Sequence, residues 1–399
     1  MAILTQSPTD PAFVQNPYAF YASARAQGPI HHWADYDMRA AFSNAAVSAC
    51  LRDRRFGREA PPECAPDIPD HLRAFYAVEM HSMLELEPPR HTRLRRLVLA
   101  AFTSRRIAAM GPEIAALSRH LIDAFPAGSF DLIPAFANKV PVIIIARLLG
   151  VPDSIGNQLL AWSNAMVSMY QARRTPQIEA AASAAAGEFS DFLRAYVDER
   201  RARPGDDLIT HLIAAEEEGN RLTTDELIAT CILLLNAGHE ATVHTIGNGV
   251  KLLLESGANT ATHGDGVLAP DGIDRTVEEI LRFDPPLHMF TRWAYEDIDV
   301  MGRQFKRGDQ IALMLAAANR DPGIWDAPDV FDPTRRIQSN ASFGAGLHFC
   351  LGAPLARLEL RTALPALFEQ CPKLRLDAPP RYANLYHFHG LERLMVTAR

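Results

Sequence analysis

The sequence lacks the signatures of several protein classes. It has only five cysteines in 399 residues, and they are scattered with no CxxC pair, so neither a disulfide framework nor a structural zinc site is expected. No apolar run approaches the roughly 20 residues that span a bilayer. The N-terminal residues are acidic and proline-rich where a signal peptide is basic and then apolar. We therefore expect a cytoplasmic protein with no membrane partner.

The sequence also has no excess of basic over acidic residues. The formal net charge is −7, which argues against nucleic acid as the main partner, because binding to phosphates needs a basic face. Apolar residues make up 48% and charged residues 22% of the chain, an ordinary globular balance. No linker rich in proline, glycine and serine divides the sequence, so we expect a single domain over residues 1–399.

Helical periodicity dominates the sequence. The clearest helix follows Thr223, which stands in capping-box relation to Glu226, and its pattern ends at Gly257. About 33 helical residues make a rod of roughly 50 Å. This helix is apolar nearly all round, so we expect it in the middle of the protein. Further helices are predicted near residues 91–101, 112–124, 141–149, 155–171, 176–202 and 274–283.

Strand signals are few. Residues 298–314 alternate around a glycine turn and predict a hairpin, and residues 392–398 predict a strand near the C-terminus. Residues 321–340 are rich in proline and aspartate and predict an irregular packed loop. The predicted fold class is mostly α with a small β portion.

One cysteine, Cys350, stands at a chemically distinctive place. It follows Gly344 and Gly346 and comes just before a helical pattern. Backbone N–H groups at a helix start, together with the positive end of the helix, stabilise a thiolate. A buried helix-capping cysteine explains the same letters, and His348, two residues away in a loop, gives no sign of acting as a base. These residues alone leave both interpretations open.

The stretch "FGAGLHFCLG", residues 343–352, closely resembles the haem-binding loop of the cytochrome P450 family. The resemblance implies haem b (iron protoporphyrin IX) as cofactor, with the Cys350 thiolate as the axial ligand of the iron. It also implies one role for each of five neighbours: Phe343 packs over the sulfur, Gly344 and Gly346 shape the loop, His348 bonds a haem propionate, and Gly352 lets the helix begin close to the porphyrin.

Two further motifs match the same family. "EEILR" carries Glu279 and Arg282, which would ordinarily be read as a surface ion pair. In the family this pair is buried and completed by an arginine from the loop before the cysteine, here Arg335, and the triad is structural. "RHTRLRR" carries His91 and Arg95, which with Arg292 match the basic residues that hold the haem propionates.

The predicted central helix contains "AGHEAT", residues 237–242, where the family has an oxygen-activating motif. Gly238 marks the place where the family's helix bulges over the iron, and Glu240 would be the acid that relays protons. The next residue in the family is normally a threonine, whose hydroxyl bonds oxygen, but here it is Ala241, followed by Thr242. One step along a helix is about 100°, so Thr242 cannot simply replace it.

Three explanations of this departure stay open. The substrate or an ordered water supplies the missing hydroxyl, or Glu240 and His239 reroute the protons, or the enzyme performs an oxidation that depends less on controlled oxygen activation.

Two smaller departures from the family pattern concern packing. Residues 255–272 are poor in apolar residues where the family has a helix, and Pro365 would kink or end the cysteine helix near Leu364.

The resemblance also indicates, by position, which residues line a substrate pocket. They are Met83, Leu84, Leu233, Asn236, Ala237, Leu287, His288, Phe290, His387 and Phe388. Asn236, His288 and His387 are more polar than a plain hydrocarbon requires, which favours a substrate with a carboxylate, phenol or amide beside a cyclic body. Histidines in the core or on the surface explain the same letters.

The activity that the resemblance implies is monooxygenation of a small to medium organic molecule, by hydroxylation, oxidative dealkylation or epoxidation, with O2 and two electrons. No flavin or dinucleotide motif is present, so the electrons should come from a ferredoxin or flavodoxin with its NAD(P)H reductase. Oxidative coupling, peroxide-driven oxidation and a haem sensor or carrier are the alternatives. A docking face for the acidic partner is predicted at Arg93, Arg96, Arg105 and Arg357, which could equally be separate solvated arginines.

Overall fold

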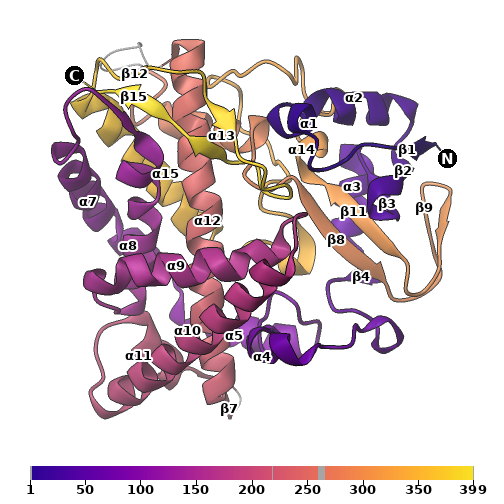
Figure 1. Cartoon of the computed structure of the whole chain (residues 1–399), viewed down its shortest axis with the longest axis horizontal. Coiled ribbons are helices and arrows are strands. Elements are labelled where there is room, and N and C mark those ends of the chain that lie inside the picture. The colour runs from indigo at the N-terminus through magenta and orange to yellow at the C-terminus, as the bar shows by residue number, and fades with distance from the viewer. Residues whose placement is uncertain (1, 218, 259–265, 399) are drawn as a thin grey trace.

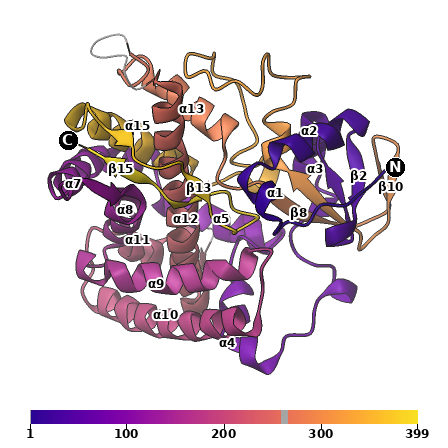
Figure 2. The ribbon, with the colours of Figure 1, turned by 45° about the horizontal axis from the view of Figure 1, so that its top comes forward.

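The computed structural model describes residues 2–217, 219–258 and 266–398. A helical part and a smaller sheet-containing part lie side by side, and the sheet lies next to the N-terminus (Figures 1 and 2). The helices are α1 (Pro11–Gln15), α2 (Tyr18–Gln27), α3 (Asn44–Arg52), α4 (Arg73–Glu79), α5 (Arg90–Ala101), α6 (Ser104–Ala109), α7 (Gly111–Asp123), α8 (Lys139–Leu149), α9 (Gly156–Val167), α10 (Pro176–Ala202), α11 (Leu208–Ala214), α12 (Thr224–Ser256), α13 (Ile273–Phe283), α14 (Leu315–Ala318) and α15 (Ala353–Gln370). Every predicted helix is confirmed, although the one expected at residues 155–171 ends as the short 3₁₀ turn η6 (Ser168–Tyr170).

Helix α12 runs through the middle of the molecule, as its apolar sequence predicts (Figure 1). It has 33 residues, and both hydrogen bonds of the predicted capping box between Thr223 and Glu226 are formed. Gly257 ends the helix with a positive φ of 69°, a conformation that glycine adopts without steric cost. Helices α4, α8, α9, α10, α13 and α15 all contact α12.

The sheet has six strands in the order β1-β2-β3-β11-β8-β4. The strands are β1 (Ile3–Leu4), β2 (Ile30–Trp33), β3 (Met38–Ala41), β4 (Phe56–Gly57), β8 (Met289–Ala294) and β11 (Gln310–Met314). β1 pairs with β2 and β3 with β11 in parallel, and the other pairs are antiparallel. Since β8 and β11 join the N-terminal strands, the sheet ties the N-terminal segment to residues 289–314.

The predicted hairpin is confirmed over β9 (Ile298–Val300) and β10 (Arg303–Phe305), but β11 leaves it to join the large sheet. The predicted C-terminal strand is also confirmed and consists of two short segments. The remaining strands form three small sheets: β12 (Arg375–Leu376) with β15 (Met395–Thr397) and β5 (Ser129–Asp131), β13 (Arg381–Tyr382) with β14 (Leu391–Arg393), and β6 (Glu216–Glu217) with β7 (Asn220–Arg221).

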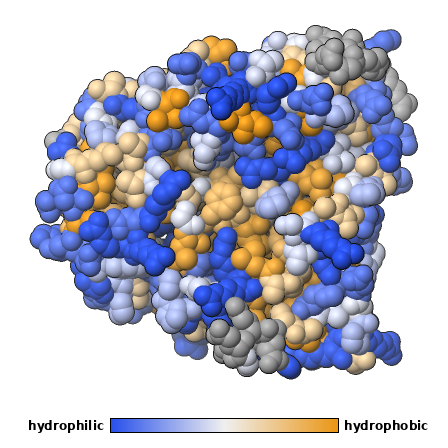
Figure 3. Space-filling model, turned by 180° about the vertical axis from the view of Figure 1, so that it is seen from behind, coloured by the Kyte–Doolittle hydropathy of each residue, from blue (hydrophilic) through white to orange (hydrophobic). Residues whose placement is uncertain are grey.

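The outer surface is mostly polar. Seen from behind, it is hollowed near its middle, and apolar side chains lie at the bottom of the hollow (Figure 3). None of the described helices is long and apolar enough to cross a lipid bilayer.

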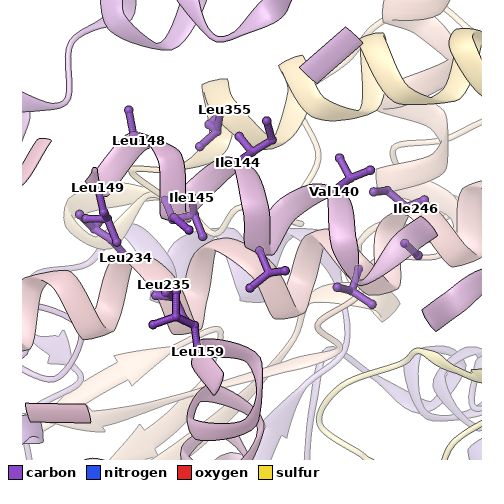
Figure 4. Close-up of a cluster of buried hydrophobic side chains, with 14 of the residues drawn as sticks. Val140, Ile144, Ile145, Leu148, Leu149, Leu159, Leu234, Leu235, Ile246 and Leu355 are labelled. Atoms are coloured by element: carbon purple, nitrogen blue, oxygen red, sulfur yellow. The ribbon is translucent and has the colours of Figure 1, made fainter. Parts of the chain in front are cut away.

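The core between α8, α12 and α15 is built from aliphatic side chains. Figure 4 shows residues of α8 pointing toward its neighbours on several sides. Ile144 and Ile145 of α8, Leu235 and Ile246 of α12, and Leu355 of α15 are each at most 4% exposed. Full burial of one such side chain contributes roughly 1.5–3 kcal/mol. This packing fixes the position of α12 relative to the helix that follows Cys350.

Two sequence-based expectations concern irregular segments. The loop at residues 321–340 contains turns and bends and has no helix or strand, as predicted. In the segment 255–272, α12 extends to Ser256 and residues 266–272 form turns, so irregular structure is confirmed there, while residues 259–265 lie outside the described residues.

Of the two predicted effects of Pro365, a kink or an end of the helix, the end is wrong, because α15 continues to Gln370. A proline inside a helix removes one hydrogen bond and costs roughly 3 kcal/mol. Leu364 and Leu367, on either side of it, are completely buried and Phe368 is 7% exposed. Their burial offsets the lost hydrogen bond, so packing overrides the local preference.

The predicted triad of Glu279, Arg282 and Arg335 is assembled and buried. Arg282 Nε and Nη2 each donate to the Glu279 carboxylate over 2.7 Å, and Arg335 Nε lies 3.2 Å from the same group. Arg282 also donates to the carbonyl oxygens of Asn319, Pro328 and Val330. The ordinary interpretation as a surface pair is therefore wrong, and the triad fastens α13 to the irregular loop that leads to Cys350.

Replacing the triad's acid should destabilise the protein strongly. Glu279→Gln leaves Arg282 buried without its anion, and we expect the free energy of unfolding to fall by about 3–5 kcal/mol. Urea denaturation followed by circular dichroism measures this loss. The matched control is Asp274→Asn on the same helix, which breaks the exposed pair with Arg361 and should cost about 1 kcal/mol or less. Equal losses for the two variants would contradict a structural role for the triad.

Candidate functional site

Cys350 lies in the loop between the 3₁₀ turn η8 (Gly346–His348) and α15. Its sulfur accepts hydrogen bonds from the backbone N–H groups of Gly352 and Ala353, and its own N–H donates to the Phe343 carbonyl over 3.0 Å. Burial raises the pKa of the Cys350 thiol, while these hydrogen bonds and the charges of Arg95 and Arg357 act in the opposite direction. Burial outweighs them, so the chain by itself favours the thiol, and bonding to a metal would deprotonate it.

Glycines make the tight approach of this loop possible. Gly344 and Gly346 have φ values of 66° and 70°, which other residues rarely adopt. A Cβ at Gly346 would collide with the Leu51 carbonyl oxygen, and one at Gly344 would lie 3.3 Å from the Phe290 ring. Glycine is therefore required at both positions, because of the backbone conformation and because of the limited space.

Phe343 and Gly352 flank the cysteine in the loop and at the start of α15. The Arg357 guanidinium lies 4.5 Å from the centre of the Phe343 ring, a cation–π contact that holds the ring beside the loop. Gly352 caps α15, and a Cβ added there would be 3.9 Å from the Cys350 sulfur. At this position, the small residue leaves the helix start open next to the thiol.

The four basic residues predicted to hold propionates gather beside this loop. The His91 and His348 rings are 4.4 Å apart, and Arg95 Nη2 donates to the Phe349 carbonyl over 2.7 Å. His348 Nε2 lies 2.8 Å from Glu87 Oε1. Arg292 is only 2% exposed and donates to the Thr291 carbonyl.

The electrostatics of these residues favour an anionic neighbour. Burial and then the charge of Arg58 lower the pKa of Arg292 to about 10. Burial and then His348 lower the pKa of His91 to about 4, and its Nδ1 is buried with no hydrogen-bond partner. A buried cation or unpaired imidazole nitrogen is costly, and a carboxylate beside it removes that cost.

Helix α12 presents a face of small side chains in the interior. Leu233, Ala237 and Ala241 follow one another at intervals of four residues and share one face. Ala237 is exposed and the other two are partly exposed, although most residues of this helix are buried. An exposed alanine in the middle of a central helix means that this face borders an open space.

Glu240 lies between two histidines on α12. Its carboxylate oxygens are 3.3 Å from His239 Nε2 and 3.1 Å from His244 Nε2. Burial acts to raise the pKa of the Glu240 carboxyl, but the hydrogen bonds from His239 and His244 outweigh it and hold the pKa well below its usual range. At neutral pH, Glu240 is therefore an ionised acid held between two imidazoles that hydrogen-bond it.

The hydroxyl of Thr242 does not replace the one missing at Ala241. Thr242 is 3% exposed and bonds the Gly238 carbonyl over 3.1 Å, while Thr245 bonds the Ala241 carbonyl over 2.7 Å. Such bonds to the carbonyl four residues earlier tend to bend helices. The helix bulge that the family resemblance implies at Gly238 does not interrupt α12, which is continuous there.

The residues present fit haem b. A thiol that receives two backbone hydrogen bonds, a tight glycine loop, and basic side chains with an unpartnered buried nitrogen form one wall, and the small residues of α12 border an open space. Cys350 would ligate the iron, and His91, Arg95, Arg292 and His348 would hold the propionates. The iron would supply the activation of oxygen.

Two of the apolar residues predicted to line the pocket, Leu287 and Phe388, come together. Leu287 and Phe388 form an antiparallel bridge, and the Phe388 ring centre is 6.0 Å from that of His244, next to Glu240. Phe290 lies against Gly344. Met83 is 7% exposed and Leu84 is partly exposed, in the turn between α4 and α5.

The polar pocket residues are placed differently from the prediction. His288 is fully buried and bonds Tyr21 Oη over 2.9 Å. His387 uses one ring nitrogen on Tyr36 Oη and the other on the Tyr170 carbonyl. Because neighbouring residues of an extended segment point to opposite sides, these histidines lie on the other side of the segment from Leu287 and Phe388.

Asn236 is also turned away from the small-residue face. It is 8% exposed and its amide lies 3.7 Å from the Met166 sulfur of α9. One helical step separates it from Ala237, which is enough to move it to the interface between α9 and α12.

Sequence reasoning missed the polar partners that surround the predicted residues. Glu87 bonds both His348 and the Arg58 backbone N–H, and Glu85 bonds Arg58 Nη2 over 2.6 Å. The signal was present in "MLELEPP", where two acids alternate with leucines. Acids in an apolar segment indicate buried partners, but the sequence does not say which ones.

Comparison with known proteins gives consistent results. The family model described as Cytochrome P450 matches residues 273–378. The cytochrome P450 monooxygenase PikC of Streptomyces venezuelae is 37% identical over 384 residues, which is 92% of this chain and 87% of that protein. The biotin biosynthesis cytochrome P450 of Bacillus subtilis is 35% identical over 402 residues and covers 99% of both chains.

Solved structures agree with these sequences. The crystal structure of P450BioI, in complex with an acyl carrier protein ligated to hexadec-9Z-enoic acid, has a TM-score of 0.91 and 34% identity. It covers 97% of this chain and 100% of that chain. The chain therefore belongs to the cytochrome P450 family and is a monooxygenase that uses haem b.

Proposed function

We propose that this P450 hydroxylates an organic substrate in the cytoplasm as a single domain over residues 1–399, with electrons from a separate ferredoxin or flavodoxin and its NAD(P)H reductase. The observation that carries the proposal is the Cys350 sulfur, which receives hydrogen bonds from the N–H groups of Gly352 and Ala353. Hydrogen bonds to a ligating sulfur tune the potential of the metal it binds.

Each wall of the site has its own task in this proposal. His91, Arg95, Arg292 and His348 orient the haem through its propionates, and Leu287 and Phe388 exclude water from the substrate side. His348 would have to exchange its bond to Glu87 for a propionate or share it between the two acids. Bound haem supplies the activation of oxygen and its insertion into a C–H bond.

Proton delivery falls to Glu240 and His239 rather than to a hydroxyl. His239 Nε2 lies 3.3 Å from both the Asn164 Oδ1 and the Glu240 carboxylate, and Asn164 is exposed on α9. Its Nδ1 lies 3.2 Å from both Ser163 Oγ and the Leu235 carbonyl. His239 Nε2 thus lies between the exposed Asn164 and the Glu240 carboxylate, where its N–H can donate to that carboxylate.

Two of the arginines predicted to bind the redox partner already form ion pairs within the protein. Arg93 pairs with Glu226, and Arg357 pairs with Glu278, with Nε 2.5 Å from the carboxylate. Two of the four predicted docking arginines therefore already have carboxylate partners, and the face is less positive than the sequence predicts.

Replacing the proposed iron ligand should abolish the thiolate signature. In Cys350→Ser, we expect the red-shifted Soret band of the reduced CO complex to disappear, because the sulfur that causes it is gone. Absorption spectroscopy of the haem-loaded protein measures this. Cys64→Ser, near Gly308 in the sheet-containing part, should keep the band. A wild-type protein that binds haem without this band would overturn the proposal.

Altering the proton route should change coupling, the ratio of product formed to NADH consumed. His239→Phe removes the proton carrier, and we expect coupling to fall about tenfold while hydrogen peroxide release rises. Ala241→Thr should change the ratio by itself and partly restore it in the His239→Phe background. The control is Ser163→Ala, which leaves Nε2 in place. Unchanged ratios in His239→Phe would exclude this route.

The electron source separates monooxygenation from peroxide-driven oxidation. With a ligand chosen because it shifts the iron spin state, we expect product with NADH, a ferredoxin and its reductase, and about a hundredfold less with hydrogen peroxide alone, because Glu240 is placed to deliver protons to oxygen. Mass spectrometry with labelled oxygen measures both. Faster turnover with hydrogen peroxide than with NADH and the redox proteins would support peroxide-driven oxidation.

A further inference from the structure

A second group of polar side chains lies away from the thiol and from Glu240. It consists of Arg58, Glu79, Glu85 and Tyr170, here called the Glu79 cluster. Tyr170 Oη donates to Glu79 Oε2 over 2.7 Å, and Arg58 Nη2 donates to Glu85 Oε1 over 2.6 Å. The four residues come from the segment after β4, the end of α4, the turn before α5, and η6. Four separate segments therefore bring their polar side chains to one place.

This cluster belongs to the substrate side of the site. The Arg58 guanidinium lies 5.8 Å from the centre of the Phe290 ring, and Phe290 also faces Gly344 of the cysteine loop. Met83 and Leu84, predicted pocket residues, stand in the same turn as Glu85. Glu79 and Tyr170 are each partly exposed, so the cluster is not sealed within the core.

The charges of the cluster do not balance. It holds two carboxyl groups, Glu79 and Glu85, but one guanidinium, Arg58, whose Nη2 is used on Glu85 and whose Nε is buried. Burial and the Glu85 carboxylate raise the pKa of Glu79 to about 8, against the opposing effects of Tyr170 and Arg58. Without a further cation, Glu79 is therefore mostly a neutral acid at pH 7.

We propose that the Glu79 cluster recognises a protonated amine of the substrate. The ammonium N–H would donate to Glu79, which Tyr170 holds in place, while Arg58 keeps Glu85 oriented and ionised. A substrate carboxylate is disfavoured because it would meet two acids against a single arginine, whose Nη2 already donates to Glu85. This inference rests on the proposed function and replaces the preference for a carboxylate, phenol or amide.

Binding of the amine should release a proton from the protein. A cation beside Glu79 favours its ionised form, so the complex forms as Glu79 gives up its proton to solvent. The charged or titratable groups that face Glu79 are Glu85, Arg58 and Tyr170. Since the free acid loses its proton as the pH passes about 8, affinity for the ammonium should rise between pH 6 and pH 8, by at most tenfold per pH unit.

The test uses the haem-loaded protein and three matched probes. They are dimethyl(phenylbutyl)amine, the hydrocarbon with carbon in place of its nitrogen, and phenylpentanoate. Isothermal calorimetry at pH 7 should show that the amine binds about tenfold or more tightly than the hydrocarbon, and that phenylpentanoate binds most weakly. Calorimetry in two buffers of different ionisation enthalpy should show that nearly one proton is released with the amine and none with the hydrocarbon.

Single-residue variants test whether Glu79 is the group that binds the amine. Glu79→Gln keeps the shape and removes the charge, so it should lower amine affinity about tenfold and leave hydrocarbon affinity unchanged. Glu63→Gln, an exposed acid paired with Arg307, is the control and should change neither. If Glu79→Gln does not fold, Tyr170→Phe serves instead. Loss of its hydrogen bond should move the pH at which amine binding strengthens upward.

Three results would overturn this inference: equal affinity for amine and hydrocarbon, equal losses for both in Glu79→Gln, or amine nitrogen bound to the iron, seen as a red-shifted low-spin Soret band. Each leaves the proposed function standing as long as the reduced CO complex keeps its thiolate signature. Loss of that signature in the wild type would instead defeat the proposed function itself.

Discussion

The burial of helix α12 is the constraint on which the rest of the structure depends. Its 33 residues are apolar on nearly every side, so the protein has to surround it. Helices α8, α9 and α10 cover it on one part of its circumference, and α13 and α15 on another. Because α15 begins directly after Cys350, the packing that buries α12 also determines where the thiol lies.

Electrostatic cost shapes the wall of the site that carries Cys350 and the basic residues. Burial lowers the pKa of both Arg292 and His91 below their ordinary values, which means that each is held in surroundings that disfavour its charge. The propionates of haem would remove this cost, and the Cys350 thiol, whose pKa burial raises, would ligate the iron as a thiolate. Cofactor binding and stability of this wall are therefore coupled.

Local sequence signals predicted what local physics determines. The capping box at Thr223, the glycine loop before Cys350 and the spacing of Glu279 and Arg282 each specify a backbone geometry or a helix face, and each was found as expected. Pro365 failed as a helix terminator because burial of Leu364 and Leu367 outweighs one missing hydrogen bond.

The direction of single side chains could not be predicted, because it depends on partners far away in the sequence. His288 bonds Tyr21 and His387 bonds Tyr36, and each partner lies more than 250 residues earlier in the chain. The Glu79 cluster was missed for the same reason, since four segments supply it.

The roles of Cys350 and of the electrostatics around it can be tested on the resting protein without any substrate. Iron K-edge X-ray absorption of the haem-loaded protein measures the atoms bound to the metal. The account predicts one sulfur neighbour in the wild type that is absent in Cys350→Ser. An iron surrounded only by nitrogen and oxygen in the wild type would contradict it.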